Sequence, residues 1–253
     1  MPLLKKPKLL GDYNVKDSVA PTLTTVTFVS NNSTTTLAKA GDVVTLAFVP
    51  SEAINSIVCT IAGKNVTPIQ INPLSYSATY TMVSGDTTGS IPLTINFKDV
   101  HGVSGTQVIV STGGEIVTFD KTLPTATLTY SIDGGSNYTT TARVNDADTL
   151  RIKAVFSEVV KDSPVPKLTI DNAVLSATNM TKTNSTTYYY DLNVPVGDFT
   201  ATCSVTLAQD LAGNVITAAP TNATFTVDNT VPTLVSVTKT NVTTLNVVLS
   251  QLE

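Results

Sequence analysis

The sequence predicts an all-β protein made of β-sandwiches in tandem, and three observations lead to this prediction. Charged residues make up 13% of the 253 residues, about half the usual share of about 25%, while Thr, Val, Ser and Asn are abundant in every segment. β-Branched side chains favour strands over helices, and no segment repeats apolar residues at helical spacing over more than two turns. One short motif also returns with a period of roughly 100 residues, close to the size of one β-sandwich domain. We therefore expect almost no helix.

The repeated motif marks the junctions between the predicted domains. Each copy begins with an aspartate and has proline and threonine at its fifth and sixth positions. The three copies are Asp17–Leu23, Asp120–Ala126 and Asp228–Leu234. Proline fixes φ and cannot donate a hydrogen bond to a neighbouring strand, so it belongs where one strand ends and the next begins. We therefore predict last strands before the motif, at 115–119 and 223–227, and first strands after it, at 24–29, 127–131 and 235–238.

A second correspondence lies inside the domains. Residues 42–52 and 148–158 align without a gap, and both segments end on Ser-Glu. Apolar residues alternate in both, which places them on one face of a strand. We expect this face to lie in a core, and its members are Val44, Leu46, Phe48, Leu150, Ile152 and Ala154.

Late in each domain an apolar strand, 93–97 or 203–207, runs into a tight turn. The turns begin at Asp99 and Asp210 and each has a glycine at its fourth position. The aspartate side chain can close such a turn, and glycine supplies a positive φ. Counted back from the aspartate, the inward positions of the two strands differ by one residue. A β-bulge or a misalignment is therefore expected in one of the two domains.

These features resemble the bacterial immunoglobulin-like (Big-type) tandem repeats of surface adhesins and S-layer-type proteins, which also occur in fibre and decoration proteins of phages and large viruses. The residues that carry the resemblance are 156–160, 187–193, 210–214 and 225–233. The resemblance is weaker in the first domain, where Val100 and His101 replace Leu211 and Ala212. It implies tandem immunoglobulin-like β-sandwiches with a structural or adhesive role.

The motif spacing and the resemblance together predict four segments. Residues 18–120 and 121–228 form two complete modules, residues 1–17 form an arm that includes a segment similar to a closing strand, and residues 229–253 supply the opening strands of a partial module. Uncovered apolar positions in the partial module predict either a chain cut from a longer array or completion by a neighbouring copy through strand addition. The expected partners are neighbouring modules or copies of the chain itself, with glycans or a host surface as further candidates.

Charge and hydropathy disfavour two classes of partner. A net charge of −4 argues against nucleic acid, because that interaction needs clustered Lys and Arg facing phosphates. The sequence contains no apolar run of about 18 residues, which is the length that would predict a membrane span. The N-terminal segment lacks the apolar stretch of a signal peptide. The favoured location is extracellular, at the cell surface, and the alternative is a virion component assembled in the cytoplasm.

The inventory of reactive side chains does not predict an enzyme. The single histidine, His101, stands alone in a predicted turn, where we expect a solvated side chain, and acid-base or nucleophilic chemistry needs several titratable groups together. Cys59 and Cys203 lie in different modules, so we expect two buried free thiols. The run 188–190 of three tyrosines is the alternative signal, for a carbohydrate-binding module. On a strand, however, Tyr189 points away from its neighbours, and core packing explains the run as well.

Calcium is the cofactor that the sequence suggests. It binds about six to eight oxygen ligands, and the surface repeats named above often place carboxylates near their junctions. The candidate ligands are Asp120, Asp228, Asp146, Asp148, Glu158 and Asp210, together with Asp17 in the first copy of the motif. No Asp-x-Asp-x-Asp-Gly loop occurs, and aspartates that cap turns or stay solvated are the alternative explanation.

Overall fold

The computed structural model describes residues 17–172, 174–241 and 243–250, and within them the chain forms strands and turns but no helix. The predicted all-β fold is confirmed. The chain divides into two compact units, Met1–Lys121 and Thr122–Glu253. Among the described residues, no helix is long and apolar enough to cross a membrane.

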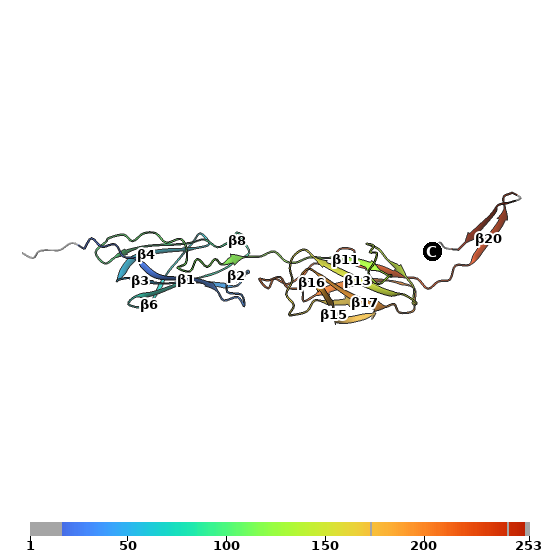
Figure 1. Ribbon diagram of the computed structural model, residues 1–253, viewed down its shortest axis with the longest axis horizontal. Helices are drawn as coiled ribbons and strands as arrows, with labels where there is room; N and C mark the ends of the chain where they lie inside the picture. Colours follow the sequence, from blue (N-terminus) through green and yellow to red (C-terminus); the bar gives the residue numbers. More distant parts are fainter. Residues whose placement is uncertain (1–16, 173, 242, 251–253) are drawn as a thin grey trace, which may run out of the picture. The chain divides into compact units, whose positions relative to one another are not determined.

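The first unit contains three sheets around one core (Figure 1). The largest is antiparallel and has the order β1-β3-β7-β6, with strands Leu23–Ser30, Val43–Pro50, Ser75–Thr81 and Ile69–Asn72. The second has the order β5-β4-β9, with strands Lys64–Val66, Ile54–Ile61 and Leu93–Asp99. The third has the order β2-β10-β8, with strands Leu37–Ala38, Thr118–Phe119 and Gly89–Ser90.

The second unit repeats this plan with two sheets, one of four strands and one of five. One has the order β11-β13-β17-β16, with strands Ala126–Ser131, Thr149–Phe156, Thr187–Asn193 and Thr181–Asn184. The other has the order β12-β19-β18-β14-β15, with strands Arg143–Val144, Thr224–Val227, Phe199–Thr206, Lys167–Ile170 and Leu175–Asn179. A separate hairpin follows, formed by β20 (Leu234–Lys239) and β21 (Leu245–Leu249).

Alternation along β3 and β13 buries the predicted face in each unit. In β3 the side chains of Val44, Leu46 and Phe48 are at most 1% exposed, and the three equivalent residues of β13 are fully buried. The ring of Phe48 stacks on Tyr76 of the neighbouring strand, with centroids 5.4 Å apart. Burying each large side chain of such a set stabilises the fold by about 1.5–3 kcal/mol. The two predicted inward faces are therefore confirmed as the centres of two cores.

The expected irregularity lies in the second unit, at Leu207. In the first unit Phe97 and Asp99 are both buried with one residue between them, so β9 alternates up to its turn. In the second unit Leu207 adopts a left-handed backbone conformation, with φ of 62°, and is exposed, whereas Ala208 is buried. One additional residue is thus accommodated between Val205 and the buried Asp210, which explains the one-residue difference between the strands.

Each unit is closed by a parallel pair that joins an early strand to the last strand. β10 pairs with β2 in the first unit, and β19 pairs with β12 in the second. The same two backbone hydrogen bonds recur: Thr118 N–H to Thr36 O (2.9 Å) and Asp120 N–H to Ala38 O (2.8 Å), then Thr226 N–H to Ala142 O and Asp228 N–H to Val144 O (both 2.9 Å). The junction aspartates therefore end the last strand of each unit with an equivalent hydrogen bond.

Both cysteines are buried free thiols, as predicted, and each is 1% exposed. Burial raises the pKa of Cys59 to about 11 and that of Cys203 to about 12. An unfolded chain has a thiol pKa of about 8.5. The folded state therefore holds both thiols protonated at a pH where the unfolded chain already ionises.

We predict from this difference that alkaline conditions favour unfolding. The thiol contribution to stability is complete below a pH of about 8.5 and declines as the pH rises toward the folded-state pKa values, because the unfolded chain loses its protons first. The measurement is urea denaturation across this pH range, with a Cys203→Ala variant as control. The variant should lose less stability per pH unit, and equal slopes for both proteins would contradict the prediction.

Truncation of a buried residue should destabilise its own unit. Leu46→Ala is expected to lower the free energy of unfolding of the first unit by about 2–5 kcal/mol, because it leaves a cavity in a filled core. Thr45→Ala, on the partly exposed face of the same strand, should change it by less than about 0.5 kcal/mol. Both variants can be measured by chemical denaturation. Equal losses would show that the inward face of β3 is misassigned.

Candidate functional site

The structure divides the predicted calcium ligands of the second unit between its two ends. Asp146 and Asp148 precede β13, whereas Glu158 follows it, and this 8-residue strand is about 26 Å long. Asp120 directly follows the last strand of the first unit, and its N–H donates to Ala38 O. The six residues therefore do not converge on one ion.

Asp146, Asp148 and Asp228 lie in the turns at the end of the second unit where β13 begins. Asp228 accepts a hydrogen bond from Arg143 Nη1 at 2.8 Å and another from the N–H of Thr230 at 3.0 Å. The N–H of Asn145 donates to Asp148 Oδ2 at 2.9 Å. These are the contacts of carboxylates that hold turns or pair with a cation of the protein.

Glu158 and Asp210 lie at the other end of the second unit, with carboxylate oxygens within 4.8 Å of each other. Asp210 is 1% exposed. Its Oδ1 accepts hydrogen bonds from the N–H groups of Gly213 and Asn214, and its Oδ2 accepts one from the Asn214 side chain at 2.7 Å. Both oxygens of this buried carboxylate are thus satisfied within the turn.

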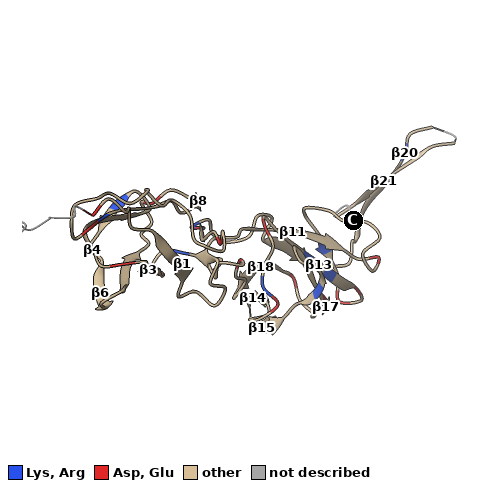
Figure 2. Ribbon diagram, turned by 60° about the vertical axis from the view of Figure 1, so that its left-hand side comes forward, with Lys and Arg blue, Asp and Glu red and all other residues tan. Residues whose placement is uncertain are grey.

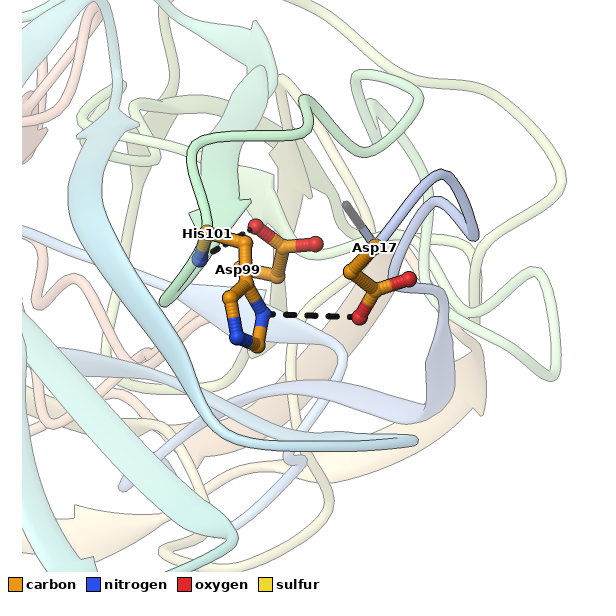
Figure 3. A group of neighbouring side chains, drawn as sticks. All are labelled: Asp17, Asp99 and His101. Carbon is orange, nitrogen blue, oxygen red and sulfur yellow. Dashed lines mark hydrogen bonds and ion pairs between the residues drawn. The ribbon is translucent and has the colours of Figure 1, made fainter. Parts of the chain in front are cut away.

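A different cluster lies in the first unit, where Asp17, Asp99 and His101 come together (Figure 3). One potential ligand atom from each residue lies within 4.8 Å of the other two. His101 Nδ1 is 3.4 Å from Asp17 Oδ2. Asp17 belongs to the first copy of the junction motif, whereas Asp99 ends β9 and His101 follows in the turn. The fold therefore unites residues that are far apart in the sequence.

Each aspartate of this cluster uses one oxygen to build its own turn. Asp17 Oδ1 accepts the N–H of Val19 at 2.9 Å. Asp99 Oδ1 accepts the N–H groups of His101 and Val103, both at 2.8 Å. Asp99 is 0% exposed, and its Oδ2 has no hydrogen-bond partner among the described residues. In Figure 3 this second oxygen lies on the side that faces Asp17.

The turns at Asp99 and Asp210 have the same backbone hydrogen bonds but different side chains. The N–H of Asp99 donates to Val103 O and the N–H of Asp210 to Asn214 O, at 2.9 and 3.0 Å. Val103 therefore occupies the position of Asn214, and its apolar side chain cannot donate to the aspartate. His101 occupies the position of Ala212. The first turn therefore lacks a side-chain donor for the second aspartate oxygen and contains an imidazole instead.

No local pattern in the sequence predicts this cluster, because a lone histidine in a turn is expected to be solvated. The His101 side chain is 58% exposed, in agreement with that expectation, yet its Nδ1 faces Asp17. The available signal is the alignment of the two turns, in which the buried aspartate keeps its place while Asn becomes Val and Ala becomes His.

The three consecutive tyrosines alternate between the two faces of β17, as predicted. Tyr188 is buried, and Tyr190 packs against the core from a partly buried position. Tyr189 lies on the outer face, where the guanidinium of Arg151 stands 4.2 Å from its ring centroid and also pairs with Asp191 at 2.7 Å. Figure 2 marks the positions of the basic residues along β13. One face of the Tyr189 ring is therefore covered by a charged group rather than open for stacking on a sugar.

The hairpin β20–β21 is separate from the sheets of the second unit (Figure 1). Both of its strands expose apolar side chains. Val237 pairs with Val247 across the hairpin, and both are about half exposed. This antiparallel pairing repeats that of the first strand with the third in each unit, β1 with β3 and β11 with β13. Its apolar face is uncovered among the described residues, and completion of the sandwich by a neighbouring copy stays a prediction.

No protein-family model and no curated protein matches the chain. Among solved structures, a similar one is the SGBP-B protein of the Bacteroides ovatus mixed-linkage glucan utilization locus, in complex with a mixed-linkage heptasaccharide. The identity is 14% and the TM-score is 0.22, over 80% of this chain and 45% of that chain. The chain thus spans less than half of that protein, and a likeness at this level carries no argument about ligand or function.

Proposed function

We propose that the chain is a non-enzymatic structural and adhesive module of a tandem immunoglobulin-like array, exposed on a bacterial surface or in a fibre, where it transmits tension along the array. The observation that carries the proposal is the closure of both units by the same parallel pair, β2–β10 and β12–β19. A parallel closing pair that occurs in both units indicates a mechanical property that every unit of an array needs.

The direction of the paired strands determines how they respond to force. Tension enters a unit ahead of its early strand and leaves it beyond its last strand. Two parallel strands are then pulled in opposite directions along their common axis, so their hydrogen bonds must yield together. Strands pulled apart from one open end would instead separate one hydrogen bond at a time. The parallel pair is therefore the geometry that resists extension.

Side chains reinforce the pair in the second unit. Arg143 lies on β12, and its guanidinium contacts Asp228, just beyond the end of β19, at 2.8 Å. Because the arginine is largely exposed, this ion pair contributes only about 0–1 kcal/mol to stability. Its position still connects the two strands that tension would separate.

Force spectroscopy on the full chain, held at its two ends, tests this proposal. We expect two unfolding events, each extending the chain by roughly 30 nm, because about 100 residues extend to about 33–36 nm and the folded unit already spans a few nanometres. Thr226→Pro removes the N–H that bonds to Ala142 and should lower the force of one event while leaving the other unchanged. Thr118→Pro should have the matching effect on the other unit.

The result that would contradict the proposal is equally specific. Extension without resolvable force peaks, or peaks that neither proline variant lowers, would show that the parallel pairs do not resist tension. Forced unfolding reports the unfolding rate rather than equilibrium stability. Urea denaturation of the same variants therefore shows how much of any change is a general loss of stability.

Surface display has its own test, which also separates the cell surface from a virion. A labelled antibody against the chain should bind intact cells of the source organism without permeabilisation, or else purified virus particles. Labelling of intact cells supports the array on a bacterial surface, and labelling of particles alone supports the virion alternative. Labelling that requires permeabilised cells and is missing from particles would contradict both.

A further inference from the structure

A buried carboxylate oxygen without a hydrogen-bond partner requires an explanation, and Asp99 Oδ2 is such an atom among the described residues. The cost of leaving a buried polar group unpaired is higher for charged groups than for neutral ones. In the second unit the Asn214 side chain removes this cost for Asp210. In the first unit Val103 cannot do so, and the two groups gathered beside Asp99 are a second carboxylate and an imidazole.

We propose that Asp17, Asp99 and His101 bind a divalent transition-metal cation, with zinc as the representative ion. A cation would satisfy Asp99 Oδ2 where the second unit uses an amide. Two carboxylate oxygens and one imidazole nitrogen form a mixed donor set typical of zinc and its first-row neighbours, whereas calcium prefers oxygen ligands alone. Three protein ligands leave a fourth position for water.

The separation of the ligand atoms fits this class of ion. A tetrahedral zinc with bonds of about 2.1 Å holds its ligand atoms about 3.4 Å apart. His101 Nδ1 and Asp17 Oδ2 are already 3.4 Å apart, and one potential ligand atom from each of the three residues lies within 4.8 Å of the other two. The His101 side chain is 58% exposed, so its movement on metal binding would not disturb the core.

The site is also organised in advance by its turns. The Oδ1 atoms of Asp17 and Asp99 are fixed by backbone N–H groups, which leaves the two Oδ2 atoms for the cation. Ligands fixed in this way lose little freedom on binding. The bound ion would connect the junction motif ahead of β1 to the turn after β9. It would thereby fasten the entry of the chain to the first unit.

Zinc titration of the full chain tests the proposal, with calorimetry for stoichiometry and NMR for the site. The chain has a single histidine, so its imidazole resonances report on His101 without ambiguity. We expect one zinc ion per chain, a shift of these resonances on binding, and a zinc-dependent rise in Tm, since a ligand of the folded state stabilises it. Excess calcium should neither shift the imidazole resonances nor displace zinc.

Variants that copy features of the second turn make the test selective. His101→Ala and Val103→Asn each introduce one feature of the Asp210 turn, and each should weaken zinc binding more than about tenfold. Val103→Asn should also stay folded without metal, because the new amide can donate to Asp99 Oδ2 as Asn214 does to Asp210. The matched control is Asn214→Val, which removes a donor beside Asp210 without adding an imidazole and should leave zinc binding unchanged.

Several results would overturn the proposal. These are no zinc binding up to millimolar concentration, binding that leaves the His101 resonances unshifted, and binding that both His101→Ala and Val103→Asn retain. Displacement of zinc by calcium at the same site would assign the cluster to an oxygen-seeking cation instead. Because the readouts are metal binding and NMR, failure here is distinguishable from failure of the proposed mechanical role.

Discussion

Burial of one face of β3 and of β13 is the constraint on which each unit depends. These central strands pair on both sides, with β1 and β7 or with β11 and β17, and their inward side chains lie beneath the facing sheet. A sandwich can bury such a face only if strands late in the sequence return to cover it. The need for cover places β9 or β18 opposite and the last strand beside an early one, so the parallel closing pair follows from the same requirement.

Much of this arrangement can be predicted because its signals are local. Alternation along 42–52 and 148–158 identifies the central strands, and the junction proline identifies the first strands. The closing strand of the first unit is less predictable: the run 115–119 suggests a full strand, yet β10 comprises only Thr118–Phe119. The hydroxyl of Ser111 donates to the backbone carbonyl and to the carboxylate of Glu115. Glu115 is thus part of a loop structure that precedes the short strand.

The candidate site cannot be predicted in the same way, because it depends on contacts between distant parts of the chain. Asp17 stands out through its motif and Asp99 through its turn, but nothing local indicates that the two meet. The sequence also does not indicate which of the candidate calcium ligands lie together, and β13 separates Asp146 and Asp148 from Glu158. Sequence spacing identifies turn residues well, while their tertiary neighbours depend on how the sheets close.

The two turns after β9 and β18 show how one fold satisfies a buried carboxylate in different ways. Both aspartates organise the turn through backbone N–H groups, and this role alone explains why each turn begins with aspartate. The remaining carboxylate oxygen needs a partner of its own. In the second unit the side chain of Asn214 donates to it, whereas the turn of the first unit has different residues at two positions, His101 and Val103. Loss of the amide alone would leave an uncompensated cost. In the first unit, however, an imidazole and a second carboxylate lie beside Asp99. This is the arrangement expected when a cation takes the place of the amide hydrogen bond to Asp99 Oδ2.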